Sequence, residues 1–128
     1  MQIDRFDHLV LTVADIDATV AFYRDVLGMQ PVVFAGGRTA LTFGRAKINL
    51  HQAGREFEPK AATPRSGSAD FCLVTEDPLD DVVAELAALG VPVEVGPVDR
   101  TGAIGPIRSV YVRDPDGNLV EISTYRSG

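Results

Sequence analysis

Alternating hydrophobic and polar residues predict the same order of elements in two successive stretches of the chain. In the first stretch, alternation over residues 7–13 predicts a strand, and apolar residues at helical spacing after Asp15 predict a helix that ends at Gly28. Three further short strands are predicted at residues 31–34, 39–43 and 47–52. The first stretch is therefore predicted to fold as βαβββ.

The second stretch follows residues 54–67, a segment that glycine and proline interrupt repeatedly. A strand is predicted at residues 71–75, and Asp77 as a helix cap, Pro78 at the first helical position and Gly90 at the helix end follow it. Further strands are predicted at residues 93–95, near Val98, and at residues 107–113 and 119–125. The second stretch thus repeats the order of the first.

A constant offset supports an internal repeat. Shifting the chain by about 62 residues superposes the first strands, both predicted caps and both helix-ending glycines. We therefore expect an α+β fold built from two βαβββ repeats. The expected single domain spans residues 1–128, with repeat 1 at about 4–53, a linker at 54–67 and repeat 2 at about 68–126.

The repeat singles out polar residues at equivalent positions of the first and last strand of each half. These are His8, Asn49, Asp70 and Glu121. His51 lies two residues after Asn49, and the period of two in a strand puts it on the same face. Because a buried unpaired carboxylate is costly, Glu121 must either reach water or hold a cation. The strand-borne polar residues are therefore the candidate functional residues.

Composition narrows the choice of partner. The 128 residues carry a net charge of −6, which disfavours a nucleic acid or an anionic membrane as the partner. The single cysteine, Cys72, excludes an internal disulfide and suits a reducing compartment. No leader or membrane-span pattern is found, so we expect a cytoplasmic protein.

Three motifs together resemble the vicinal oxygen chelate superfamily. They are DHLVLTV at residues 7–13, FYRDVLG at 22–28 and DPDGNLVE at 114–121. This superfamily includes glyoxalase I, extradiol dioxygenases, fosfomycin-resistance enzymes and bleomycin-binding proteins. Within it, KINLHQ at 47–52, FEPKA at 57–61 and RTGA at 100–103 look most like the small glyoxalase-domain proteins often labelled virulence or dioxygenase-related.

The resemblance implies that the two repeats form a curved mixed sheet around a cavity that holds a divalent metal ion, such as Fe, Mn, Ni, Co or Zn. His8 and Glu121 match the family's ligand positions directly. Asn49 stands where glyoxalase I has a glutamate, and Asp70 stands where a second histidine is usual. His51 is expected to replace the missing imidazole, Asp70 is a further candidate ligand, and Asn49 is assigned to substrate binding.

Two classes of function follow from the resemblance. One is a metal-dependent enzyme acting on a small vicinally oxygenated substrate, either a glyoxalase I-like lyase or an extradiol dioxygenase-like enzyme, in which Glu121 also moves a proton. The other is a metal-free binding protein that sequesters a ligand, as bleomycin-resistance proteins do. In both, the expected partner is a small molecule and the expected assembly is a homodimer.

Each candidate also has a structural interpretation. His8 could be a hydrogen-bonded core residue, and Glu121 could form an ion pair with an arginine across the sheet. His51 could be a strand-end residue that faces solvent, and Asp70 could cap a turn.

Two further residues are singled out. Arg100 is assigned to substrate binding because it opens a glycine-bearing segment, residues 100–106, of the kind that closes over a cavity. An ordinary connecting loop is the competing interpretation. Cys72 alternates with Asp70 along the predicted strand, but a small buried apolar residue is the better interpretation of it.

Overall fold

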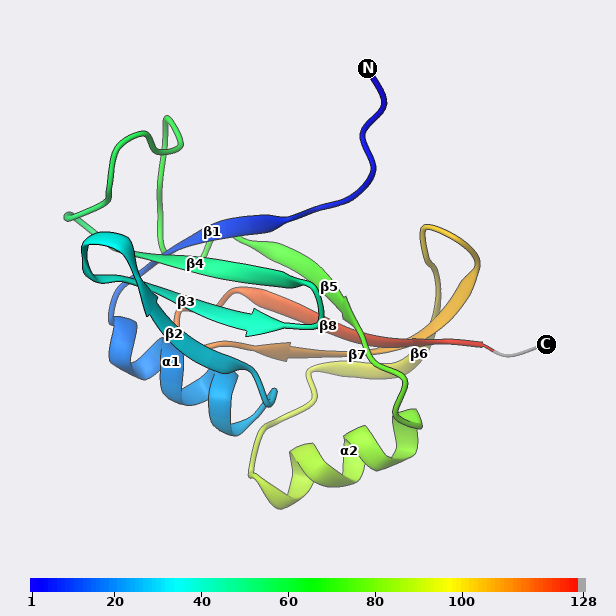
Figure 1. Cartoon of the computed structure of the whole chain (residues 1–128). Helices are drawn as coiled ribbons and strands as arrows, with labels where there is room; N and C mark the ends of the chain where they lie inside the picture. Colours follow the sequence, from blue (N-terminus) through cyan, green and yellow to red (C-terminus); the bar gives the residue numbers. More distant parts are fainter. Residues whose placement is uncertain (127–128) are drawn as a thin grey trace. The chain divides into compact units, whose positions relative to one another are not determined.

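The computed structural model describes residues 1–126 of the chain, which form two compact units, one of residues 1–68 and one of the described residues from 69 onward. In the described residues, each unit contains one α-helix and one four-stranded sheet (Figure 1). Both helices have ten residues, and neither is long and apolar enough to cross a membrane.

The first unit follows the predicted order. Its elements are β1 (His8–Val13), α1 (Ile16–Asp25), β2 (Gln30–Phe34), the 3-10 turn η1 (Ala35–Gly37), β3 (Arg38–Phe43) and β4 (Ala46–Gln52). The strands are ordered β1-β4-β3-β2, with β1 parallel to β4 and the other neighbours antiparallel. The parallel pair brings the first and last strand of the repeat side by side.

The second unit has the same topology. Its elements are β5 (Asp70–Val74), α2 (Leu79–Ala88), β6 (Val95–Thr101), β7 (Pro106–Arg113) and β8 (Leu119–Tyr125). The strand order is β5-β8-β7-β6, again with a parallel first pair. The predicted α+β fold of two βαβββ repeats is confirmed.

The core of the first unit is made by alternate strand residues. Leu11 and Val13 of β1 and Ile48 and Leu50 of β4 are at most 3% exposed, and α1, which contacts β2, β3 and β4, contributes the fully buried Tyr23. The period of two places His8, Val10 and Thr12 on the opposite face of β1. Burial of one face thus leaves the other available for a site.

The predicted cap of the first helix is confirmed. Asp15 has extended backbone angles, and its carboxylate accepts hydrogen bonds from the backbone N–H groups of Asp17 at 2.9 Å and Ala18 at 3.3 Å. These bonds satisfy two of the N–H groups that have no partner inside the helix.

The predicted cap of the second helix is wrong. Pro78, which was expected at the first helical position, is the N-cap and has extended angles, so α2 begins only at Leu79. Asp77 therefore lies one residue outside the cap position, and no side-chain hydrogen bond caps α2. A carboxylate caps a helix only from the N-cap residue itself, because the free N–H groups are two and three positions further on.

This difference gives a stability prediction. Asp15→Ala is expected to lower the free energy of unfolding by about 1 kcal/mol, because two helix N–H groups lose their acceptor. Asp77→Ala is the matched control and is expected to leave it unchanged, because Asp77 does not cap α2. Urea unfolding of the parent and the two variants measures both. Equal losses in the two variants would contradict the assignment of the caps.

The strand predicted at 93–95 is wrong for residues 93 and 94, which lie in no strand. Val95 and Val98 belong to a single strand, β6, whose register against β7 shifts between these two residues. Arg100 pairs with Ile107 in this ladder, so Arg100 belongs to a strand and not to the predicted loop at 100–106. Pairing with β7 overrides the local glycine signal, because the ladder satisfies backbone groups that a loop would leave to water.

Candidate functional site

Three candidate residues share one face of the first sheet. In the parallel β1–β4 ladder, His8 pairs with Lys47, Val10 with Asn49, and Thr12 with His51. Paired residues in a ladder project to the same side, and so do residues two apart on one strand. His8, Asn49 and His51 therefore project from the same face.

His8 is held by its neighbour. Its Nδ1 lies 2.8 Å from Oδ1 of Asp7, and the side chain is 44% exposed, so His8 is not the buried core residue of the structural interpretation. The hydrogen bond to His8 is the main cause that lowers the pKa of Asp7, against a smaller opposing effect of burial. Histidines that bind metals usually direct one ring nitrogen to a carboxylate in this way. The second nitrogen, Nε2, has no partner among the described residues.

Asn49 carries an unsatisfied oxygen. Its side-chain Oδ1 is buried and has no hydrogen-bond partner among the described residues. A buried carbonyl oxygen without a partner costs stability, so such an atom is more common at a binding site than in an ordinary core. Asn49 therefore presents an acceptor on the face that carries His8.

His51 is buried but distant from His8 along the sheet. It is 8% exposed, which excludes the solvent-facing strand end of the structural interpretation. His51 lies four positions beyond Lys47, the residue that pairs with His8. At about 3.3 Å per residue, this separates the two histidines by about 13 Å along the strands. The two imidazoles thus lie at different places on one face.

Glu121 sits in the middle of the second sheet, on β8 between Cys72 of β5 and Tyr111 of β7. The Ser109 hydroxyl donates to Glu121 Oε2 at 2.7 Å, and the Ser123 hydroxyl donates to the same oxygen at 3.2 Å. These serines, and not the arginine of the structural interpretation, are the partners of Glu121 in the described residues. One carboxylate oxygen is therefore held while Oε1 is left as an open acceptor.

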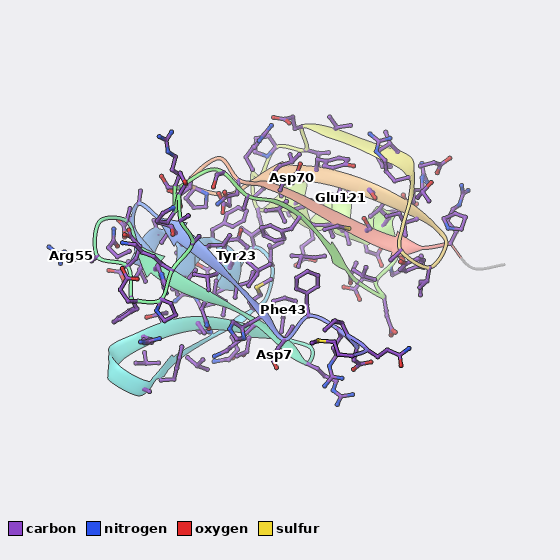
Figure 2. The ribbon with its side chains drawn as sticks, turned by 90° about the horizontal axis from the view of Figure 1, so that it is seen from above. Asp7, Tyr23, Phe43, Arg55, Asp70 and Glu121 are labelled. Atoms are coloured by element: carbon purple, nitrogen blue, oxygen red, sulfur yellow. The ribbon has the colours of Figure 1, made fainter. Side chains whose placement is uncertain are left out.

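Asp70 and Arg100 line the same hollow as Glu121. The hollow measures about 390 Å³, and Figure 2 shows Asp70 and Glu121 in the unit that β5 and β8 belong to. Arg100 donates from Nε to the Tyr111 hydroxyl at 3.0 Å, with its guanidinium carbon 5.5 Å from the centre of that ring. The second unit thus brings together three of the residues that the sequence singled out.

Sequence reasoning missed the side chains that position Glu121. Ser109 and Ser123 are fully buried, and Tyr111 faces the same hollow as Glu121. The signal for them was present, because Ser109 and Tyr111 alternate along the predicted strand and Ser123 lies two residues after Glu121. Polar residues at every second position of a strand mark a face that is not simply core.

Cys72 is exposed beside this cluster, and the expected buried apolar residue is therefore wrong. Its Sγ lies 3.2 Å from the Ser123 hydroxyl oxygen. Burial is the main cause that raises the pKa of the Cys72 thiol; the hydrogen bond to Ser123 lowers it, and the negative charge of Glu121 raises it further.

The raised pKa predicts slow alkylation. The thiolate is the reactive form, so the rate of Cys72 modification by iodoacetamide should rise only at a pH above that at which an ordinary free thiol ionises. Glu121→Gln removes one negative charge and should move the profile to lower pH, whereas Glu76→Gln, on an exposed residue, should not. A parent profile identical to that of free cysteine would refute the prediction.

Each of the two units offers candidate donor atoms of its own. In the described part of the chain, no three side chains of histidine, cysteine, aspartate or glutamate gather closely enough to hold a metal ion. The first unit offers His8 and the Asn49 oxygen, and the second offers Glu121 and Asp70. These imidazole, amide and carboxylate atoms are the kinds of donor that divalent ions accept.

The fold and these donors define a recognisable class of protein. The family model of the Glyoxalase/Bleomycin resistance protein/Dioxygenase superfamily matches residues 5–122, so the chain belongs to this superfamily. The resemblance expected from the sequence motifs is confirmed. Proteins of this superfamily commonly use divalent metals and bind small-molecule substrates.

Proteins of known structure are among those similar to this chain. The chain is 58% identical over 125 residues to "Virulence protein STM3117" of Salmonella typhimurium, covering 98% of this chain and 87% of the relative. The crystal structure of that protein has a TM-score of 0.97 and covers 98% of this chain and 100% of that chain. A crystal structure of lactoylglutathione lyase from Agrobacterium tumefaciens is 29% identical, with a TM-score of 0.73 and coverage of 96% and 95%.

Proposed function

We propose that the protein is a metal-dependent enzyme that acts on a small vicinally oxygenated substrate, with a glyoxalase I-like lyase as the first choice. The observation that supports this most is the environment of Glu121. Two serine hydroxyls hold one of its carboxylate oxygens and leave the other as an open acceptor on a strand face. A carboxylate that serves only the fold would have both oxygens engaged or in bulk water.

The proposed metal ligands are His8 and Glu121, the two residues that match the family positions directly. Asp7 holds one ring nitrogen of His8, which leaves Nε2 as a donor, and Glu121 contributes Oε1. A bound divalent ion would supply Lewis-acid polarisation of two adjacent substrate oxygens. Asn49 Oδ1 is proposed to accept a hydrogen bond from a substrate hydroxyl, and Asp70 is proposed as a third ligand.

Glu121 is also proposed to move the proton. In an isomerisation of this class, a base removes a proton from the carbon beside a carbonyl group and returns it to the neighbouring carbon. Because Ser109 and Ser123 hold Oε2 from one side, the carboxylate would keep its position while Oε1, when it does not hold the ion, gains or loses a proton. Arg100, held on Tyr111, lines the same hollow and is proposed to contact the substrate.

The lyase interpretation is favoured over the dioxygenase interpretation. Non-haem iron dioxygenases typically use two histidines and one carboxylate on one ion. This chain has only two histidines, and their register separates them by about 13 Å along the strands. We therefore do not adopt His51 as a ligand of the ion that His8 would bind. The likeness to a lactoylglutathione lyase at 29% identity supports the same choice.

Metal-free sequestering of a small ligand is the second candidate. It is supported by the two residues that differ from the family's ligand pattern, Asn49 and Asp70. A homodimer in the cytoplasm is proposed for either function.

Elemental analysis of the purified protein, before and after reconstitution with Fe(II), Mn, Ni, Co and Zn, tests the proposal. We expect about one ion per site in the parent, because the proposal has a single metal centre. We expect His8→Ala and Glu121→Ala each to lose this ion. His51→Ala should retain the ion, and Glu76→Ala is the control for an exposed carboxylate. No stoichiometric uptake of any ion, with the variants unchanged, would sink the enzyme proposal and leave the sequestering function.

A further inference from the structure

A second hollow lies wholly within the first unit. It measures about 480 Å³, which is within the range of sites for small ligands. Its strand side is made by Val10, Thr12 and His51, and its other side by residues of the segment that follows β4: Pro59, Lys60, Ala61 and Pro64. Most of these side chains are apolar, and Val10 remains 46% exposed.

His51 is the polar group of this hollow. The residue is 8% exposed, its ring nitrogens are not among the fully buried atoms that lack a partner, and no hydrogen bond to them is described. Its described side-chain contact is edge-to-face with the Phe57 ring, at 5.7 Å between ring centres and 70° between planes. A ring nitrogen that is not hydrogen-bonded to the protein can form a hydrogen bond with a ligand oxygen.

Phe57 connects the segment to the sheet. The Arg38 guanidinium carbon lies 4.4 Å from the centre of the Phe57 ring, while His51 contacts the same ring at its edge. A cation over an aromatic face and an aromatic pair each stabilise an arrangement by about 1 kcal/mol. The segment that carries Pro59 and Ala61 is therefore anchored beside His51, and the hollow is formed before a ligand arrives.

The charges at the rim determine the kind of ligand. Lys60 lines the hollow, but its ammonium group lies 3.3 Å from Glu58 and 3.4 Å from Glu56. Lys60 is thus already paired with two carboxylates, and the nearby Arg38 guanidinium lies over the Phe57 ring. A negatively charged ligand would have to leave water for a largely apolar hollow without an unpaired lysine to receive it, whereas a neutral ligand would not.

We propose that this hollow binds a neutral compound consisting of one apolar ring or short chain that carries a hydroxyl or carbonyl oxygen, with that oxygen hydrogen-bonded to His51. The apolar part packs against Val10, Pro59 and Ala61. The inference goes beyond the proposed metal centre and does not rest on it, since none of the proposed ligands of the ion lines this hollow.

Benzyl alcohol and benzoate are suitable probes, because they share the ring and differ in charge. Each is titrated into the full chain in EDTA, with binding followed by NMR shifts of the His51 ring and the Val10 methyl groups. Benzyl alcohol is expected to bind more tightly than benzoate. EDTA keeps this test separate from the proposed function. The hollow can bind benzyl alcohol in a protein that takes up no metal, and a protein that takes up metal can fail to bind it.

Two variants assign the site. His51→Phe keeps an aromatic ring against Phe57 but removes the hydrogen bond, so the Kd for benzyl alcohol should rise about fivefold. Ala61→Trp fills the hollow and should abolish binding, whereas Ala62→Trp, on the adjacent exposed residue outside the lining, should not. The inference would be overturned if neither probe caused NMR shifts or if benzoate bound more tightly than benzyl alcohol. Equal binding of benzyl alcohol by Ala61→Trp and Ala62→Trp would also overturn it.

Discussion

A Glu121→Gln variant is expected to lose turnover by about 100-fold or more, out of proportion to any loss of bound metal. Glutamine has the size of glutamate and retains an oxygen that can accept from Ser109 and Ser123. It cannot take up the substrate proton, however. Turnover is measured with the hemithioacetal or diol that the parent converts, and metal content is measured on the same samples.

Ser109→Ala is the companion variant, because it removes the shorter of the two bonds to Glu121 but leaves the carboxylate. It is expected to reduce turnover less than Glu121→Gln does, because the carboxylate is still present and is still held by the Ser123 hydroxyl. Turnover in Glu121→Gln within twofold of the parent would show that Glu121 moves no proton.

An Asn118→Ala variant is expected to lower the free energy of unfolding by about 3 kcal/mol. Asn118 is 1% exposed; its Oδ1 accepts from the Ala69 N–H at 2.9 Å, and its Nδ2 donates to the Asp114 carboxylate at 2.8 Å. Truncation removes both hydrogen bonds and takes away one partner each of the Ala69 N–H and the Asp114 carboxylate. Chemical denaturation of the parent and the variant measures the loss.

Asn49→Ala is the matched control for this prediction, since it truncates the same amide at a position where Oδ1 has no partner. Its effect on the free energy of unfolding is expected to stay below about 1 kcal/mol, because truncation removes a buried oxygen that makes no hydrogen bond. If both variants lose the same stability, the bonds of Asn118 do not hold the turn to β5.

The turn before β8 shows how far local sequence carries. Residues 114–117 have the sequence Asp-Pro-Asp-Gly, which by itself predicts a turn with Asp116 as its local cap. The turn is present, and Gly117 has φ +87°. The Asp114 carboxylate accepts from the backbone N–H groups of Asp116 and Asn118, at 3.0 and 2.9 Å. The residues of a turn are thus predictable from the motif. Which of its two aspartates accepts the backbone hydrogen bonds depends on the backbone geometry, which the motif does not specify.

The strand face of the candidate residues was predictable from the sequence, but their distances from one another were not. Alternation correctly placed His8, Asn49 and His51 on one face, because strand parity is a local property. The separation of His8 from His51 along that face depends on the pairing of β1 with β4, two strands that are distant in the sequence. Sequence reasoning expected His51 to substitute for the missing ligand, and the ladder instead puts it beside Val10 and Thr12.

The sequence by itself determined the elements and their repetition, because helix caps, turns and strand parity are encoded over a few neighbouring residues. Only the tertiary structure decided what surrounds the candidate residues: the serines that hold Glu121, the tyrosine that holds Arg100, and the hollow that His51 lines. Those arrangements come from strand registers and from the segment after β4, which bring together residues far apart in the chain. Contacts of that kind depend on how the sheet pairs and packs, and no local pattern specifies them.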